Sequence, residues 1–133
     1  MPRTEAATVF LICGRGAMVD AAPERAASVE GNDMTEILEI TTLRPAPGLA
    51  VADFIAANDD INEYLKRQPG FLWRRIVERD DGTIVDIVAY DDLAHAERGA
   101  AGITGEMAGS PVHAAIDHGT VDWQLTRVLQ HVE

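Results

Sequence analysis

The chain has 133 residues, a length at which we expect a single domain with its own core. Its 22 acidic side chains outnumber the 11 of Lys and Arg, and the net charge of −11 disfavours nucleic acid and anionic membranes as partners. The one cysteine cannot form an internal disulfide and is typical of a reducing compartment, so we expect a cytoplasmic protein. No apolar run reaches the roughly 20 residues that a membrane-spanning helix requires.

The first 33 residues differ from the remainder, because they are rich in Ala, Gly and charged residues and show no sustained period. We expect residues 1–33 to be a disordered extension and residues 34–133 to be the folded domain, with Met34 as a natural start. A short helix from about Pro23 to Val29 is the alternative.

The domain is expected to begin with a strand and a helix. Residues from Thr35 to Arg44 alternate in polarity and include many β-branched side chains, which favours a strand. A helix is predicted from about Leu49 to Arg67, because apolar residues recur at spacings of three and four. Asn58 interrupts this apolar stripe, and Pro69-Gly70 ends the helix.

A hairpin follows the helix, with Asp81-Gly82 as its turn. This dipeptide is favoured in two-residue type I′ turns, whose central positions both need positive φ. A two-residue loop predicts an ion pair between Arg75 and Asp86 and an aromatic pair between Trp73 and Tyr90. The face expected to pack under helices holds Leu72, Arg74, Ile76, Val85, Ile87 and Ala89. The opposite face holds Phe71, Trp73, Arg75, Val77, Ile84, Asp86, Val88 and Tyr90.

A second helix and a last strand complete the predicted domain. Asp91 or Asp92 is expected to cap the helix, whose apolar residues recur at helical spacing as Leu93, Ala96, Ala100, Ile103 and Met107. Its glycines cost up to about 1 kcal/mol each relative to Ala, but they would let the helix lie close to the sheet. The last strand is predicted from Thr120 to about His131.

The order βαββαβ predicts an α+β, ferredoxin-like domain, in which two helices cover one face of a four-stranded antiparallel sheet. The other face needs a cover, and a second copy of the chain would supply it. We therefore expect a homodimer through the face that carries Trp73, Arg75, Val77, Val88 and Tyr90.

Over residues 34–133 the chain resembles the dimeric α+β barrel superfamily and, within it, the antibiotic-biosynthesis-monooxygenase-like group. The resemblance rests on the βαββαβ order, Gln68-Pro-Gly-Phe-Leu, the hairpin from Trp73 to Asp92 with Asp86-Ile-Val, and the Leu93-Ala-His-Ala opening of the second helix. It implies two sheets face to face in a dimer, with a small pocket between sheet and helices in each subunit. The group includes quinone-forming oxygenases, haem degraders and isomerases, so the activity stays open.

The haem-degrading branch usually has an asparagine on the first strand, a tryptophan ending the third, and a histidine about ten residues later. Here the first strand has no asparagine, the third ends at Tyr90, and Ala100 occupies the position of the histidine. Haem is therefore disfavoured, and we expect no cofactor.

The group's cofactor-independent oxygenases use asparagine, tryptophan, arginine and tyrosine around an aromatic substrate. This resemblance makes Asn58 a candidate catalytic residue and Asn62, Trp73 and Tyr90 candidate substrate-binding residues. Alternatively, the two amides bond backbone or lie in water at the helix edge, and the two rings fill an interface between sheets.

His113 is the candidate acid–base catalyst, because an unperturbed histidine titrates near neutral pH. It forms a His-x3-Asp-His group with Asp117 and His118, but the spacing matches none of the strong zinc motifs, and we expect no metal. A solvated or capping role is the alternative for His113.

Two interpretations follow. One is a cofactor-independent monooxygenase or isomerase acting on a small aromatic or enolisable metabolite. Asn58 or Asn62 would then orient the substrate or stabilise an oxyanion, Trp73 and Tyr90 would stack on it, and His113 would move a proton. The other is a non-catalytic homodimer that binds a small molecule or has a structural role.

Overall fold

The computed structural model describes residues 35–133. The expectations for residues 1–33 and for Met34 lie outside this range. The elements in chain order are β1 (Ile37–Pro45), α2 (Val51–Ala56), α3 (Asp59–Lys66), β2 (Phe71–Glu78), β3 (Ile84–Tyr90), α4 (Leu93–Thr104), the 3-10 helix η2 (Pro111–Ala115) and β4 (Ile116–Arg127).

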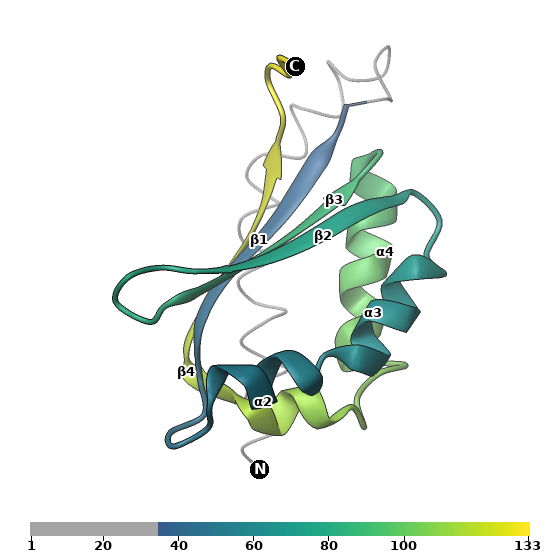
Figure 1. The fold of residues 1–133 in the computed structure, drawn as a ribbon. Helices are drawn as coiled ribbons and strands as arrows, with labels where there is room; N and C mark the ends of the chain where they lie inside the picture. The colour runs from purple at the N-terminus through teal and green to yellow at the C-terminus, as the bar shows by residue number, and fades with distance from the viewer. Residues whose placement is uncertain (1–34) are drawn as a thin grey trace.

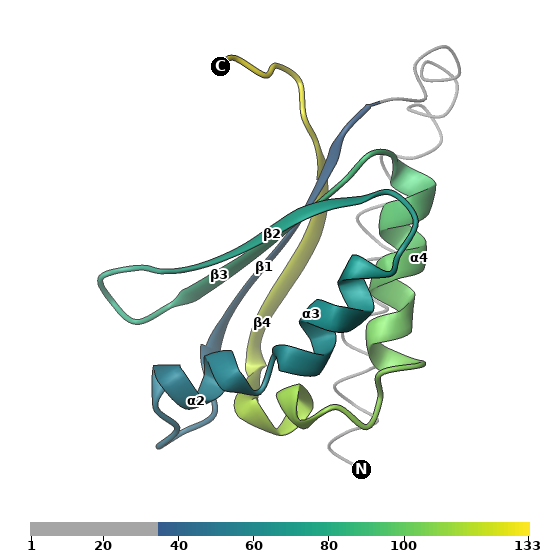
Figure 2. The ribbon, with the colours of Figure 1, turned by 45° about the vertical axis from the view of Figure 1, so that its right-hand side comes forward.

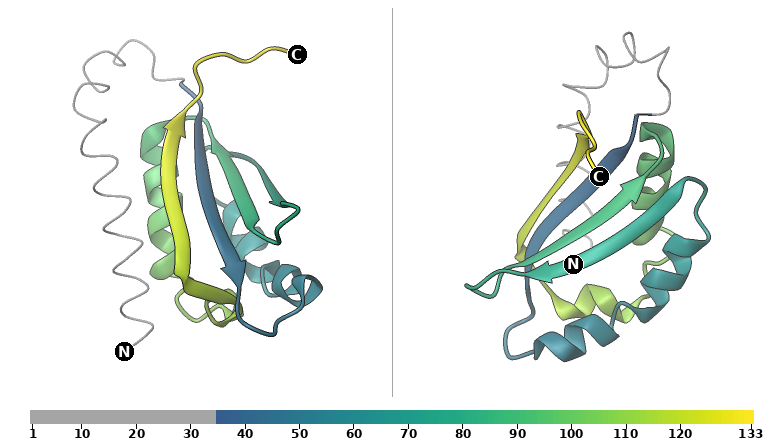
Figure 3. Two further views of the ribbon diagram at one scale, coloured as in Figure 1. Left: turned by 90° about the vertical axis from the view of Figure 1, so that its left-hand side faces the viewer. Right: turned by 45° about the horizontal axis from the view of Figure 1, so that its top comes forward.

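The described part of the chain forms one antiparallel sheet with the strand order β2-β3-β1-β4. The two central strands are β3 and β1, and the β2–β3 hairpin extends beyond the helices (Figure 1). The helices all lie on one side of the sheet (Figure 2), and the views of Figure 3 show the opposite side without a helix from this part of the chain. The predicted ferredoxin-like α+β fold is confirmed.

The first predicted helix is interrupted, because α2 ends at Ala56 and α3 begins at Asp59. The Asn58 side-chain amide donates a hydrogen bond to the Phe54 carbonyl at 2.9 Å, while its backbone N–H donates to the Ile55 carbonyl at 3.0 Å. A side chain that takes the i−4 carbonyl competes with the backbone ladder and favours a break. The same residue that interrupts the apolar stripe therefore also interrupts the helix.

The hairpin turn differs from the prediction. The Arg79 N–H donates to the Thr83 carbonyl at 2.8 Å, which leaves a three-residue loop of Asp80, Asp81 and Gly82. Gly82 has φ 90°, whereas no described residue other than glycine has positive φ, so a type I′ turn is excluded. The Asp81 carboxylate accepts the Thr83 N–H at 2.9 Å, an interaction that favours this longer turn.

The extra loop residue shifts the hairpin register by one, and this shift changes which side chains share a face. Arg74 pairs with Val88, Ile76 with Asp86, and Phe71 with Tyr90. The residues of β2 and β3 on the helix-facing side are therefore Phe71, Arg74, Ile76, Ile84, Asp86, Val88 and Tyr90. The predicted pairs Arg75 with Asp86 and Trp73 with Tyr90 were wrong, and Leu72 lies in a bulge of β2.

The glycines of α4 leave room for two tyrosine rings against the helix. A Cβ atom on Gly99 would collide with the Tyr90 hydroxyl, and one on Gly102 would collide with the Tyr64 hydroxyl. The Tyr64 hydroxyl donates to the Gly99 carbonyl at 2.9 Å. The two rings, both at most 2% exposed, fill the core between α4, α3 and the sheet.

The last strand starts earlier than predicted, at Ile116, because the short helix η2 ends at Ala115. It pairs with β1 along most of its length, with a register shift between Thr42 and Arg44. Within residues 35–133, no helix is both long enough and apolar enough to cross a membrane.

Candidate functional site

Polar side chains gather on the helix-facing side of the sheet, among apolar neighbours. The alternation of β1 directs Ile37, Glu39, Thr41 and Leu43 to this side, and Glu39 and Thr41 are buried. The strand register places Thr41 between Asp86 of β3 and Trp123 of β4. The carboxyl groups of Glu39 and Asp86 and the indole of Trp123 thus lie close together between the sheet and the helices.

Arg74 and Asp86 form a bidentate ion pair on this face. Arg74 Nε donates to Asp86 Oδ1 at 3.0 Å, and Nη2 donates to Oδ2 at 2.7 Å. The side chains are 10% and 16% exposed. Parallel N–H···O bonds of this kind fix the guanidinium in one plane. The pair therefore holds a positive charge in a defined orientation below α3.

Both predicted asparagines contact this guanidinium. Arg74 Nη2 donates to Asn58 Oδ1 at 2.8 Å, and Nη1 donates to Asn62 Oδ1 at 2.6 Å. Asn58 is 1% exposed and has both ends of its amide bonded, since its Nδ2 donates to the Phe54 carbonyl. The structure therefore brings Asn58 and Asn62 together through Arg74, which was predicted to lie on the helix-facing side of the hairpin.

Glu39 lies in the same buried space and is held by an indole. Trp123 Nε1 donates to Glu39 Oε2 at 2.6 Å, and the Glu39 residue is 8% exposed. Burial raises the pKa of Glu39 to about 7, although the indole hydrogen bond and Arg74 oppose the shift; Asp86 adds to it. A carboxyl with this pKa is able to accept or release a proton near neutral pH.

Tyr90 is fully buried beside this group. Its hydroxyl has no hydrogen-bond partner among residues 35–133. Burial, followed by the nearby Glu39 carboxyl, raises the pKa of Tyr90 well above its usual range, so the hydroxyl stays neutral. Its donor is therefore unused among residues 35–133, and the hydroxyl lies against Gly99 of α4.

Trp73 occupies the opposite side of the sheet, because it precedes the inward-facing Arg74. The guanidinium of Arg75 lies 4.7 Å from the centre of its ring. The predicted hairpin register placed Trp73 and Tyr90 on one face, but in the structure they lie on opposite faces and do not line one site together.

His113 is held at the end of α4. Its Nε2 lies 3.2 Å from the Ile103 carbonyl and 3.0 Å from the Met107 carbonyl. Because both partners only accept, Nε2 carries the hydrogen and donates. Among residues 35–133, His113 has no hydrogen bond to Asn58, Asn62 or Tyr90, so the structure does not join the predicted acid–base residue to the predicted amides.

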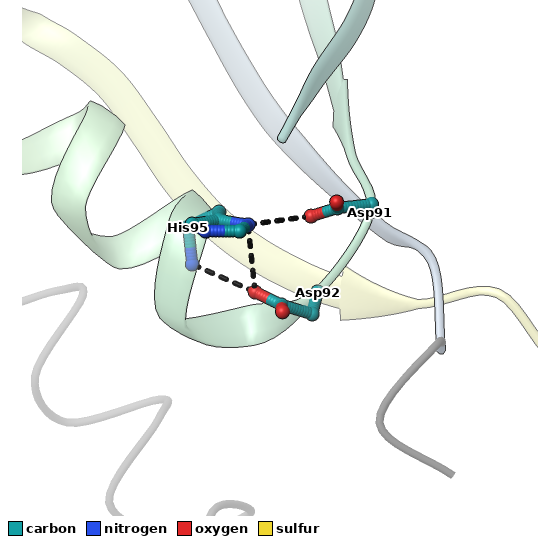
Figure 4. A group of neighbouring side chains, drawn as sticks. All are labelled: Asp91, Asp92 and His95. Atoms are coloured by element: carbon teal, nitrogen blue, oxygen red, sulfur yellow. Dashed lines mark hydrogen bonds and ion pairs between the residues drawn. The ribbon is translucent and has the colours of Figure 1, made fainter. Parts of the chain in front are cut away.

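A second polar group, Asp91, Asp92 and His95, lies at the start of α4 (Figure 4). His95 Nδ1 is 2.7 Å from Asp91 Oδ1, and Asp92 Oδ1 accepts the His95 backbone N–H at 2.9 Å. Their potential ligand atoms lie within 4.8 Å of one another. Asp91 or Asp92 was predicted to cap the helix, and the structure shows that Asp92 does. This capping explains the geometry of the group.

No protein-family model and no curated protein matches this chain. Solved structures do match. SnoaB, a cofactor-independent oxygenase from Streptomyces nogalater, is 19% identical with a TM-score of 0.60, over 74% of this chain and 97% of SnoaB. The monooxygenase ActVA-Orf6 of Streptomyces coelicolor, in complex with nanaomycin D, is 13% identical with a TM-score of 0.59, over 77% and 96%. A protein of unknown function from Nitrosomonas europaea is 17% identical with a TM-score of 0.52, over 77% and 97%.

This chain shares the fold of these three solved structures. At these low identities the likeness establishes the fold alone, and function has to be argued from the residues.

The sequence interpretation missed Glu39, Asp86 and Trp123 as site residues. Glu39 could have been found from the sequence, because the alternation of β1 places it between Ile37 and Thr41 on the side of the strand that becomes buried. A carboxylate in such a row is seldom buried without a partner. Asp86 carried no comparable signal, because its face depended on a hairpin register that the turn prediction placed one residue off.

Proposed function

We propose that this protein is a cofactor-independent monooxygenase acting on a small aromatic compound that carries a hydroxyl group. The compound would bind between the helices and the polar side chains of the sheet. The observation that carries the proposal is the buried group of Glu39, Arg74, Asp86 and Tyr90. Its occurrence in a fold shared with SnoaB, described as a cofactor-independent oxygenase, supports the assignment.

The chemistry asks little of the protein besides control of protons and charge. An aromatic alcohol with a free ring position reacts with O2 to give a quinone and water. One oxygen atom bonds to the ring carbon, and the other leaves as water with the ring hydrogen and the hydroxyl hydrogen. All four electrons that reduce O2 come from the substrate, so no external reductant is needed.

The positive charge of Arg74 would stabilise the negative charge that develops on the substrate oxygen. Asn58 and Asn62 would act as positioning residues, because their carbonyl oxygens fix the guanidinium. Buried side chains of the core, among them Tyr64, Ile61 and Val88, would exclude water from the reacting atoms.

A non-catalytic role is the second candidate, and the bonding of Arg74 favours it. Four of the five guanidinium N–H groups already donate to Asp86, Asn58 and Asn62. A network this well satisfied is also what a purely structural ion pair would show. In that case the protein would bind a small molecule, or none, as a homodimer.

Oxygen labelling separates the two functions. Protein treated with a chelator is incubated with 1-naphthol, or with two- and three-ring hydroxylated relatives, under 18O2. We expect one labelled oxygen atom in each quinone, with one O2 consumed per product, at a rate well above that of a protein-free control. Binding of these compounds without labelled quinone would favour the non-catalytic role instead.

A further inference from the structure

Glu39 and Tyr90 lie on the same face of adjacent strands. The β1–β3 register pairs Glu39 with Val88 and Ile37 with Tyr90. Glu39 and Tyr90 are therefore diagonal neighbours on one face of adjacent strands, a relation that brings side chains within about 7–8 Å. One carries an ionisable acceptor and the other a hydroxyl without a protein partner among residues 35–133.

The charges around Glu39 leave it able to change protonation state. Asp86 of β3 favours the neutral form, and Arg74 of β2 favours the carboxylate. Tyr64 of α3 and Tyr90 of β3 face it as neutral phenols, whose own pKa values are raised by burial and by this carboxyl. Trp123 of β4 donates to one oxygen but has no proton to give up at neutral pH.

The other candidate proton acceptors are ion-paired or lie at the ends of α4. Both carboxylate oxygens of Asp86 accept from Arg74. His113 donates from Nε2 to two carbonyls at the end of α4. Asp91 and His95 bond each other at the start of α4, where their side chains are 39% and 31% exposed.

We infer that Glu39 accepts the proton of the substrate hydroxyl, while the Tyr90 hydroxyl donates a hydrogen bond to the substrate oxygen. In this step the O–H bond of the substrate breaks, the proton forms an O–H bond with the Glu39 carboxylate, and the electron pair stays on the substrate oxygen. The inference rests on the proposed aromatic hydroxyl substrate. It makes Glu39 the group that activates the substrate for its reaction with O2.

The test measures proton release when 1-naphthol binds, which needs no turnover. Calorimetric titrations at about pH 6, under nitrogen, in two buffers of different ionisation enthalpy, give the number of protons released per ligand. The wild-type protein should release close to one proton, because the ligand hydroxyl favours the carboxylate form of Glu39. Glu39→Gln, which can still accept the Trp123 hydrogen bond, should bind naphthol within several-fold but release no proton.

Glu97→Gln is the control, because partial desolvation also raises the pKa of Glu97, an exposed residue of α4 that lies outside the cluster. It should release protons as the wild type does. If Glu39→Gln fails to fold, infrared spectra of the wild type replace it. The band of a protonated carboxyl should then change on naphthol binding: it disappears if the ligand keeps its proton and shifts if Glu39 takes the proton.

The outcomes distinguish this inference from the proposed function. Unchanged proton release in Glu39→Gln, or a carboxyl band that naphthol leaves unchanged, would overturn the role of Glu39 and leave the oxygenase proposal standing. Proton linkage lost only in Glu39→Gln, without labelled quinone in the oxygen experiment, would support Glu39 and overturn the oxygenase. If folded wild-type protein does not bind naphthol, both are overturned. With turnover, Glu39→Gln should lower kcat by at least about 100-fold with little change in KM.

Discussion

At the scale of single residues, Asn58 and Glu39 show how one buried polar side chain serves both packing and chemistry. Asn58 links the Phe54 carbonyl to the Arg74 guanidinium, and Glu39 receives the Trp123 indole. Neither side chain has solvent to replace its partners, since both residues are less than a tenth exposed. Changes at these positions should therefore show in stability as well as in function.

Asn58→Leu should destabilise the protein by about 1–3 kcal/mol, because it leaves the Phe54 carbonyl and one guanidinium N–H without a partner. Denaturant titration measures the change. Asn62→Leu is the control and should cost less, since Asn62 is only half-buried and loses only its bond to Arg74. Equal stability of wild type and Asn58→Leu would show that the amide is dispensable.

Glu39 should make stability depend on pH. Its pKa rises from the ordinary 4.5 to about 7 on folding, so the folded protein binds more protons between these values. This contribution is fully present below about pH 4.5 and is lost as the pH rises through 7, a change of about 3 kcal/mol. Unfolding free energies measured from pH 5 to pH 8 should fall less steeply in Glu39→Gln. Parallel curves for the two proteins would contradict the prediction.

At the scale of elements, α4 lies close to the sheet because its glycines leave space for tyrosine hydroxyls. Gly99→Ala should destabilise the protein by about 1–3 kcal/mol through overpacking against Tyr90, although Ala is the better helix former by up to about 1 kcal/mol. Thermal unfolding followed by circular dichroism measures the balance. Gly109→Ala is the control and should be neutral, because nothing lies within 4 Å of its added Cβ. A Gly99→Ala protein more stable than wild type would mean that α4 moves away easily.

At the scale of the whole molecule, one face of the sheet carries no helix from residues 35–133, and this face remains apolar after the register correction. Val88 and Tyr90 leave the predicted dimer interface, because they are at most 4% exposed and face the helices. The register assigns to the outer face the residues Leu38, Ile40, Trp73, Arg75, Val77, Val85 and Ile87. A second copy packed there would cover Val77, which is 46% exposed.

We expect a homodimer that buries well over about 1,000 Å² in total through this outer face. Val77→Asp should give a folded monomer, because it places an unpaired charge in the interface. Leu129→Asp, at an 85% exposed position beyond β4, should remain dimeric. Light scattering at micromolar concentration measures both. A wild-type protein that is monomeric under these conditions would contradict the expectation.

Local chemistry was enough to predict most elements from the sequence. Alternation identified β1, the period of three to four identified the helices, and Pro69-Gly70 marked the end of the first helical region. These patterns depend on residues that are close in the sequence, so they can be recognised without knowledge of the tertiary structure. The element order then predicted the ferredoxin-like fold, and the break in the apolar stripe at Asn58 pointed to a residue of the candidate site.

Tertiary structure decided the composition of the site. Arg74, Asp86, Glu39 and Trp123 come from four different strands, and their meeting depends on register. One extra residue in the Asp80–Gly82 loop exchanges Arg75 for Arg74 as the partner of Asp86, and it separates Trp73 from Tyr90. A side-chain period of two makes the face of a strand residue sensitive to a single position in a turn. The sequence alone therefore determined the architecture, whereas the packed sheet determined which charges are buried together.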